Sequence, residues 1–274
     1  MSVQVAMAAA RQAGRIIEQA IGDGIGRPVL PPTLQGEDGV VHKGAVDLVT
    51  RIDVACEAAI REVLERQSPG IPILGEEGGG ATAAQTRWIV DPLDGTTNFV
   101  HGFPSFAVSI ALQVDGVVTV GCIYDPLRRH LYTAERGQGA QCNGQRLQVS
   151  ATPALEDALL LTGFAYDRRE RADFYLRFVK TFMERSRGLR RAGAAALDLA
   201  HVASGRADGF WEFGLSPWDV AAGALLVEEA GGMITDMSMA NLDLDAPRLL
   251  ASNGRIHKEM SVLLMKDLNG MKPG

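Results

Sequence analysis

The sequence predicts a mixed α/β protein in which helical segments alternate with β-structure. Residues 3–21 carry apolar side chains at helical spacing with Arg11 and Arg15 inside the pattern, which predicts an amphipathic helix and argues against a signal peptide. Residues 106–114 show the two-residue period of a strand, and the start and stop signals around residues 216–230 predict another helix. A chain of 274 residues, 46% hydrophobic and 22% charged, can bury one large core or two closely packed halves.

The first helix is predicted to end at Gly22 and Gly24. Residues 22–42 are rich in glycine and proline, which predicts a loop with little regular structure. A short extended run then leads to Asp53, which can begin the next helix as its N-cap. The apolar residues after it follow helical spacing, namely Cys56, Ile60, Val63 and Leu64.

Two acidic segments follow short apolar runs. Residues 71–79, IPILGEEGG, predict a buried strand that ends in a glycine-flanked pair of glutamates. In residues 88–104, WIVDPLDGTTNFVHGFP, an apolar strand is predicted to stop at Asp91 and Asp94, where a helix start follows. Carboxylates beside the free N–H groups of a helix start are typical of sites in which a hard cation binds a phosphate. Taken alone, however, an Asp-x-x-Asp-Gly turn is more commonly a pair of solvated carboxylates.

An antiparallel meander is predicted after this segment. Strand 106–114 alternates apolar residues with smaller or more polar ones, so we expect two unlike faces. The Asp-Gly pair at 115–116 predicts a two-residue hairpin before a strand at 117–124. A strand around 131–134 and the Asn-Gly turn at 143–144 continue the meander.

The C-terminal half is predicted to contain three further helical segments. The first lies within residues 154–186, where three aromatic residues at helical spacing are expected in the core: Phe174, Phe178 and Phe182. The second is a Gly-Ala-rich helix that contains His201, which we interpret as a core or surface residue because no second histidine stands at a metal-binding spacing. A strand carrying Glu212 follows it.

The third helix is predicted to begin with Ser216 as its N-cap and Pro217 at its first position, and to end at Gly231. Asp219 then falls in the first turn. There the helix dipole favours a carboxylate by about 0.3–1 kcal/mol, so Asp219 has a structural interpretation as well as a functional one.

Composition argues against several classes of function. A net charge of −6 argues against a nucleic-acid partner. The short basic groups are interpreted as solvated faces or local salt bridges, namely residues 128–129, 168–171 and 190–191. The three cysteines are far apart and indicate reduced thiols in a cytosol-like compartment. No segment reaches the ~18 apolar residues of a membrane span, so we expect a cytoplasmic protein with no membrane partner.

Five separated motifs, over roughly residues 3–265, resemble the inositol monophosphatase family of metal-dependent sugar phosphatases. They are K-x-x-x-D-L-V-T-x-x-D at 43–53, G-E-E at 75–77, W-I-V-D-P-L-D-G-T-T-N-F at 88–99, the Trp-Glu pair at 211–212 and the Trp-Asp pair at 218–219. The resemblance implies a layered sandwich in the order α-β-α-β-α, the fold of this family, and a lithium-inhibited homodimer. We expect a single domain over residues 1–274, with most metal ligands in residues 1–150 and with residues 151–274 supplying Asp219 and Glu212.

The resemblance also implies a metal site whose ligands are Glu76, Asp91, Asp94, Asp219 and the carbonyl of Leu93. If the four carboxylates converge near 4 Å, each pair repels by roughly 4 kcal/mol at an effective dielectric constant of about 20. Divalent cations remove that repulsion. Because all of the ligands are oxygens, they favour Mg²⁺ over Zn²⁺, with Mn²⁺ as a substitute. The resemblance implies two or three ions per site.

The implied activity is hydrolysis of inositol 1-phosphate and similar sugar or polyol monophosphates by direct attack of a metal-activated water, without a covalent phosphoenzyme. Asp53 and Thr96 would orient and deprotonate the water, and Glu76 would hold the metal that activates it. The residues expected to contact substrate are Asp94, Gly95, Thr96, Ala195, Glu212 and Asp219, with Glu212 bonding ring hydroxyls. Residues 161–167, LTGFAYD, are similar to the bacterial version of the pattern and depart from the animal one.

Three alternatives remain open at this point. A related phosphatase of the superfamily could use the same metal site: a fructose-1,6-bisphosphatase, a histidinol-phosphate phosphatase or a phosphoadenosine nucleotidase. An enzyme with an aspartyl-phosphate intermediate would need an Asp-x-Asp motif, whereas Asp91 and Asp94 have two residues between them. The third alternative is a non-catalytic Mg²⁺-binding regulatory protein with the same fold.

Overall fold

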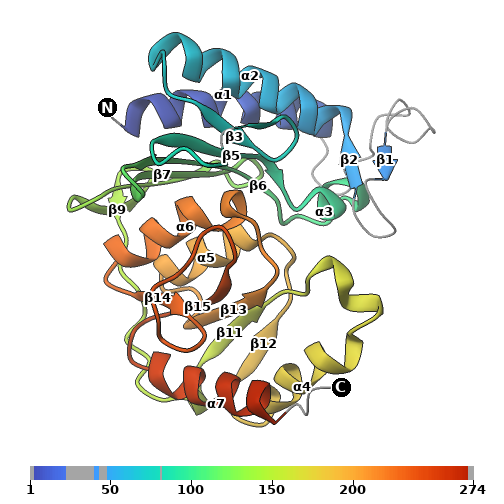
Figure 1. Cartoon of the computed structure of the whole chain (residues 1–274), viewed down its shortest axis with the longest axis vertical. Helices are drawn as coiled ribbons and strands as arrows, with labels where there is room; N and C mark the ends of the chain where they lie inside the picture. The colour runs from blue at the N-terminus through green and yellow to red at the C-terminus, as the bar shows by residue number, and fades with distance from the viewer. Residues whose placement is uncertain (1–2, 23–39, 43–47, 81, 271–274) are drawn as a thin grey trace.

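The computed structural model describes residues 3–22, 40–42, 48–80 and 82–270, and over these residues the chain forms alternating layers in the order α-β-α-β-α (Figure 1). The expected layered sandwich is therefore confirmed. Residues 23–39 of the loop predicted for 22–42 lie outside the described residues, as do Lys43 and Asp47 of the first motif. Among the described residues no helix is long and apolar enough to cross a membrane.

The first layer consists of α1 (Val3–Ile21) and α2 (Arg51–Gln67). α1 has the predicted bounds and ends at Gly22, whose φ of 69° lies in the left-handed region. Asp53 is not the N-cap of α2, contrary to the prediction. Thr50 is the N-cap because its extended backbone lets its Oγ1 accept the N–H of Ile52, and Asp53 stands at the third helical position.

The last residues of the predicted loop 22–42 form a strand. β1 (Val40–His42) pairs antiparallel with β2 (Leu48–Thr50), which leads directly into α2. The extended run predicted before Asp53 is therefore one strand of a two-stranded ribbon.

The larger sheet has eight strands and lies under α1 and α2. In spatial order they are β10 (Gln145–Arg146), β9 (Gly139–Cys142), β8 (His130–Glu135), β7 (Val117–Asp125), β6 (Ala107–Val114), β5 (Arg87–Asp94), β3 (Ile73–Gly75) and β4 (Gly79–Gly80). The predicted antiparallel meander is confirmed for β6 to β9. Asp115 and Gly116 both have positive φ, 50° and 81°, as a two-residue hairpin turn requires.

Two features of this sheet were not predicted. β5 ends at Asp94, within the predicted pair of aspartates, but its register with β6 is irregular before that point: three residue steps on β5 (91 to 94) face two on β6 (109 to 107). This bulge lets the strand pass Pro92. β6 does not have one polar face, because helices cover both sides of the sheet and every β6 residue except Val114 is buried.

The central layer consists of α5 (Ala195–Ala203) and α6 (Pro217–Glu229). α6 begins with Ser216 as N-cap and Pro217 at the first position, as predicted. Both helices are apolar on nearly all sides because each lies between two sheets. They approach closely at Gly223, where a Cβ would lie 2.5 Å from the Cβ of Leu199.

The smaller sheet has the strand order β12 (Gly188–Arg190), β11 (Leu159–Thr162), β13 (Gly209–Phe213), β15 (Arg248–Ser252) and β14 (Met233–Asp236). Its outer face is covered by α4 (Ala172–Met183) and α7 (His257–Asn269) (Figure 1). Within the described residues, the short helices are η2 (Leu155–Asp157), η3 (Tyr166–Arg169) and α3 (Thr96–His101). Phe178 and Phe182 are buried as predicted, and Phe174 packs half-buried against the same cluster.

The smaller sheet is predicted to lose stability in acid through His257. This side chain is 0% exposed, with Nε2 2.8 Å from Thr235 Oγ1 and Nδ1 2.9 Å from Ser252 Oγ, and burial lowers its pKa to about 4. In the unfolded chain the imidazole has its ordinary pKa of 6.5. Neutral His257 therefore contributes its full stabilisation of the fold above pH 6.5, and this contribution is lost as the pH falls towards 4. The loss amounts to about 3 kcal/mol of unfolding free energy.

Urea unfolding of the wild type and of His257→Gln at pH 7, 6, 5 and 4 measures this effect. The variant should be less stable at pH 7 and should depend less steeply on pH between 6.5 and 4. The exposed His101→Gln is the control and should keep the wild-type slope. Parallel slopes for all three proteins would contradict the assignment to His257.

Candidate active site

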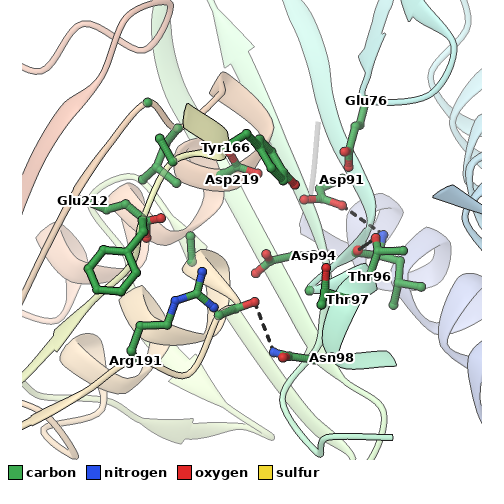
Figure 2. Close-up of a pocket in the computed structure, with 18 of the residues that line it drawn as sticks. Glu76, Asp91, Asp94, Thr96, Thr97, Asn98, Tyr166, Arg191, Glu212 and Asp219 are labelled. Carbon is green, nitrogen blue, oxygen red and sulfur yellow. Dashed lines mark hydrogen bonds between the residues drawn. The ribbon is translucent and has the colours of Figure 1, made fainter. Parts of the chain in front are cut away.

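A cavity of about 130 Å³ lies between the two sheets, and most of the residues predicted for the site line it (Figure 2). We call it the acidic pocket. The predicted residues in its lining are Glu76, Asp91, Leu93, Asp94, Gly95, Thr96, Ala195, Glu212 and Asp219. Asp53 is the predicted residue that does not line it, and lies behind Thr96.

β5 delivers Asp91 and Asp94 into the pocket from the bulge at its end. Asp91 is 1% exposed, and its Oδ1 accepts the N–H of Leu93 at 2.9 Å. Asp94 is 8% exposed, and its Oδ2 accepts the N–H of Ala196 in the first turn of α5 at 2.8 Å. The positive end of the α5 dipole therefore faces Asp94, and this bond joins the larger sheet to the central layer.

Asp219 enters the pocket from the first turn of α6. Its Oδ2 accepts the N–H of Ser216 at 2.7 Å, so the carboxylate also caps the helix. Ser109 of β6 donates to the carbonyl of Trp218 at 3.0 Å and fixes the helix start against the larger sheet. The structural and functional interpretations of Asp219 are compatible, because the carboxylate that caps the helix also offers an oxygen beside those of Asp91 and Asp94.

Three carboxylates meet in this pocket. Asp91, Asp94 and Asp219 each offer an oxygen, and these oxygens lie within 4.8 Å of one another. Burial, followed by repulsion from Glu76, raises the pKa of Asp91 well above its ordinary value, and burial raises the pKa of Asp94 to about 7. A set made only of oxygen donors with this much unfavourable charge fits a hard divalent cation such as Mg²⁺.

Glu76 lies next to this group but outside it. It follows β3, and its backbone N–H donates to the carbonyl of Val90 on β5 at 3.2 Å. Its carboxylate points towards Asp91 (Figure 2), which agrees with its effect on the pKa of Asp91. The structure thus places Glu76 at the margin of the three-carboxylate group.

Thr96 and Asp53 form a hydrogen-bonded relay that leads out of the pocket. Thr96 begins α3, and its hydroxyl proton is shared between Asp53 Oδ1 at 2.9 Å and the carbonyl of Leu93 at 3.1 Å. The other oxygen of Asp53 accepts from Thr50 N at 2.8 Å and from Thr50 Oγ1 at 2.5 Å. Burial raises the pKa of Asp53 against the opposing effect of these bonds, which makes this carboxylate a stronger base.

Glu212 lies on the opposite wall of the pocket, on β13. It is 8% exposed, and burial raises its pKa to about 8. Its carboxyl group lies against Gly163, where a Cβ would come within 2.0 to 2.2 Å of the carboxyl atoms. The glycine of the LTGFAYD segment therefore makes room for Glu212.

Sequence reasoning missed two arginines of the pocket. Arg168 and Arg191, which we predicted on solvated faces or in local salt bridges, both line it. The Arg191 guanidinium lies 5.6 Å from the ring centroid of Phe164 and partly opposes the rise in the pKa of Glu212. A run of arginines carries no signal that distinguishes the one facing a pocket. The salt bridge of Arg128 to Asp125, at 2.8 Å, agrees with the local salt bridge predicted for residues 128–129.

Asn98 was missed as well. This residue of α3 donates through Nδ2 to the carbonyls of Ser105 at 2.7 Å and Ala192 at 2.8 Å, and so ties α3 to the segment before α5. The motif that contains Asn98 predicts a turn and a helix start, but it does not reveal a partner that is 94 residues away.

Comparisons with known proteins cover nearly the whole chain. The family model described as "Inositol monophosphatase family" matches residues 2–270. A Pseudomonas aeruginosa protein named "Nus factor SuhB" is 43% identical over 97% of this chain and 96% of its own length. A Synechocystis protein named "Inositol-1-monophosphatase" is 46% identical over 82% of this chain and 79% of its own.

Solved structures show the same fold. The extragenic suppressor protein suhB from Bartonella henselae superimposes with a TM-score of 0.87 at 41% identity and covers 98% of each chain. The inositol monophosphatase from Anabaena has a TM-score of 0.84 at 41% identity and covers 96% of this chain and 95% of its own. With the fold, the acidic pocket and these matches in agreement, the chain belongs to the inositol monophosphatase family.

Proposed function

We propose that this chain is a Mg²⁺-dependent phosphomonoesterase that hydrolyses inositol 1-phosphate and similar sugar or polyol monophosphates. The observation that carries the proposal is the meeting of three buried carboxylates beside a helix start and a Thr–Asp relay. Membership of a phosphatase family supports it, and so does a relative named for inositol 1-phosphate. We further propose Mn²⁺ as a substitute metal, a lithium-sensitive homodimer as the working form, and a cytoplasmic location.

In this proposal Asp91, Asp94, Asp219, Glu76 and the carbonyl of Leu93 hold two or three Mg²⁺ ions. When bound, the metal supplies a Lewis acid that polarises the phosphoryl group and lowers the pKa of water. The protein contributes the fixed positions of the carboxylates, two of which are held by backbone N–H groups of α5 and of the α6 cap.

The remaining residues handle the water, the phosphate and the proton. Gly95 and Thr96 present the N–H groups of the α3 start to phosphate oxygens. Thr96 accepts a proton from the attacking water while its own proton passes to Asp53. A new P–O bond forms as the ester P–O bond breaks, and the alcohol leaves with a proton taken from solvent. No enzyme-bound phosphate is formed.

The polyol is proposed to lie between Ala195 and Glu212. Ala195 begins α5 and is 7% exposed, so it offers a small apolar surface. Glu212 faces the same space and can hydrogen-bond ring hydroxyls in either protonation state, because a carboxylic acid both donates and accepts. Both residues come from the C-terminal half, which therefore supplies substrate recognition together with Asp219.

Phosphate release from a panel of esters, with and without Mg²⁺, tests this function. The panel is inositol 1-phosphate, fructose 1,6-bisphosphate, histidinol phosphate and phosphoadenosine phosphate. Preference for inositol 1-phosphate supports the whole proposal. Preference for another ester supports the metal-dependent chemistry and rejects inositol 1-phosphate as the substrate. If phosphate is not released from any of the four esters, or is released equally without Mg²⁺, the proposed function is wrong.

Replacing Glu212 by Ala is predicted to affect substrates unequally. The kcat/KM for inositol 1-phosphate should fall by ~10-fold or more, since a hydrogen bond to a polyol hydroxyl contributes roughly 1–3 kcal/mol. A small aromatic phosphate has no such hydroxyl and should lose less than about 3-fold. Glu170→Ala, an exposed glutamate, should change neither rate. Equal losses on both substrates would place Glu212 outside polyol recognition.

A second candidate function is non-enzymatic, because relatives from Pseudomonas aeruginosa and Escherichia coli are named Nus factors. The two functions can be separated by asking whether the wild-type chain and its Asp94→Asn variant replace the E. coli relative in a strain that lacks it. Equal complementation by both proteins favours the non-enzymatic role, and complementation by the wild type alone favours the phosphatase.

A further inference from the structure

The turn that carries Glu76 is held by a buried glutamate of α2. Glu57 is 4% exposed, and its carboxylate accepts two consecutive backbone N–H groups, from Glu77 to Oε2 at 2.8 Å and from Gly78 to Oε1 at 2.9 Å. A carboxylate that accepts two backbone amides forms charge-assisted hydrogen bonds, which are about twice as strong as neutral ones.

Arg61 completes this contact one helical turn later. Its Nε donates to Glu57 Oε1 at 2.8 Å, and its second guanidinium nitrogen donates to the carbonyl of Gly79 at 3.1 Å. The pair therefore binds both the N–H and the C=O side of the turn. Because Glu57 is paired with Arg61 and with two amides, its buried charge is compensated.

The shape of the turn matches this contact. A Cβ at Gly75 would lie 2.6 Å from the Glu57 carboxyl carbon, and a Cβ at Gly78 would lie 2.5 Å from Oε1. Glycines on both sides of the Glu76–Glu77 pair therefore allow the carboxylate to sit against the backbone. The glycine-flanked acidic pair noted in the sequence thus has a structural reason.

α2 also carries Asp53, which stands four residues before Glu57 on the same face of the helix. A single rigid helix thus positions the Thr96–Asp53 relay at its first turn and the Glu76 turn at its second. We propose that Glu57, supported by Arg61, is a positioning residue that sets the place of Glu76 relative to the relay and to the metal-binding carboxylates. This inference rests on the proposed function.

Glu57→Gln tests the proposal, because the amide keeps the size of the side chain but loses the charge and one acceptor oxygen. Mutation of a residue that holds a metal ligand in place typically weakens metal affinity by about 10- to 100-fold. Mn²⁺ binding, followed by electron paramagnetic resonance, should weaken by ~10-fold or more. The Mg²⁺ concentration that gives half-maximal phosphate release should rise in parallel, while kcat at saturating Mg²⁺ should change less than about 3-fold.

Hydrogen exchange gives a readout that does not depend on metal or activity. The amides of Glu77 and Gly78 should exchange faster in Glu57→Gln without metal, because one of them loses its acceptor and the other keeps only the neutral amide oxygen. The matched control is Glu62→Gln on the same helix, whose ion pair with Arg66 is exposed at 74% and 62%. It should leave exchange, Mn²⁺ affinity and turnover unchanged.

The outcomes separate this proposal from the proposed function. Weaker Mn²⁺ binding and faster exchange in a chain that releases no phosphate would support the positioning role and reject the phosphatase. Wild-type Mn²⁺ affinity in a folded Glu57→Gln, or a wild type that binds no Mn²⁺, would overturn the positioning role. If Glu57→Gln does not fold, Arg61→Gln is the alternative test, because it keeps the Glu57 carboxylate. This variant should bind Mn²⁺ ~3-fold more weakly, and unchanged Mn²⁺ affinity would also contradict the proposal.

Discussion

Replacing Asp94 by Asn is expected to lower kcat/KM for Mg²⁺-dependent phosphate release by ~10³-fold, equivalent to about 4 kcal/mol of transition-state stabilisation. Asp94 is one of the three carboxylates whose oxygens lie within 4.8 Å of one another, and the neutral amide is a poor ligand for a hard cation. The fold should persist, because the Asn Oδ1 can still accept the N–H of Ala196. Alanine would leave that N–H without its acceptor and is the less informative change.

Thermal unfolding with and without Mg²⁺ separates loss of the site from loss of the fold. Burial and the nearby Glu76 make the charge of Asp94 unfavourable in the metal-free chain, so the variant in EDTA should melt at or above the wild-type temperature. Mg²⁺ should raise the melting temperature of the wild type and not that of the variant, because a ligand stabilises only the state that binds it. Asp173→Asn, on the exposed face of α4, should behave like the wild type. A variant with wild-type turnover would exclude Asp94 as a ligand.

The parts of the site that could be predicted from the sequence are those that local motifs carry. Asp91 and Asp94 stand beside a strand end and a helix start, and Asp219 stands in a first helical turn, so their residue types and positions indicated a cation site. Their convergence is a property of the fold, which brings β5 and α6 together across more than a hundred residues of chain. Only the resemblance to a family predicted that convergence.

The residues that sequence reasoning missed act through distant partners. In the sequence, Glu57 is an ordinary polar position of an amphipathic helix. Its contact with the turn after β3 depends on how that turn packs on α2. Arg191 follows another arginine, and nothing local distinguishes the one that lines the pocket. Such contacts depend on tertiary packing, which the periodicity of a single segment does not encode.

The same reasoning explains the successes and errors in the fold. α1 and the 115–116 hairpin were predicted correctly because helical periodicity and an Asp-Gly turn are local signals. β6 was predicted to have two unlike faces, but covering helices bury both of them. The N-cap of α2 was misplaced because both Thr50 and Asp53 are favourable capping residues, and only the extended backbone at Thr50 decides between them.

Replacing Asp53 by Asn is expected to lower kcat by ~10²- to 10³-fold with little change in Mg²⁺ affinity, because the proposed relay uses Asp53 as the proton acceptor and this residue does not belong to the three-carboxylate group. The change also weakens the cap of α2, which costs about 1 kcal/mol of stability. Thr96→Ala separates the two effects, since it breaks the relay and leaves the bonds between Asp53 and Thr50 intact. Single-turnover rates and Mn²⁺ titrations should show both variants slow but metal-competent, with Glu65→Gln on the same helix as the unchanged control. If Thr96→Ala turns over like the wild type while Asp53→Asn is slow, the loss reflects the helix cap, and the proposed proton relay is wrong.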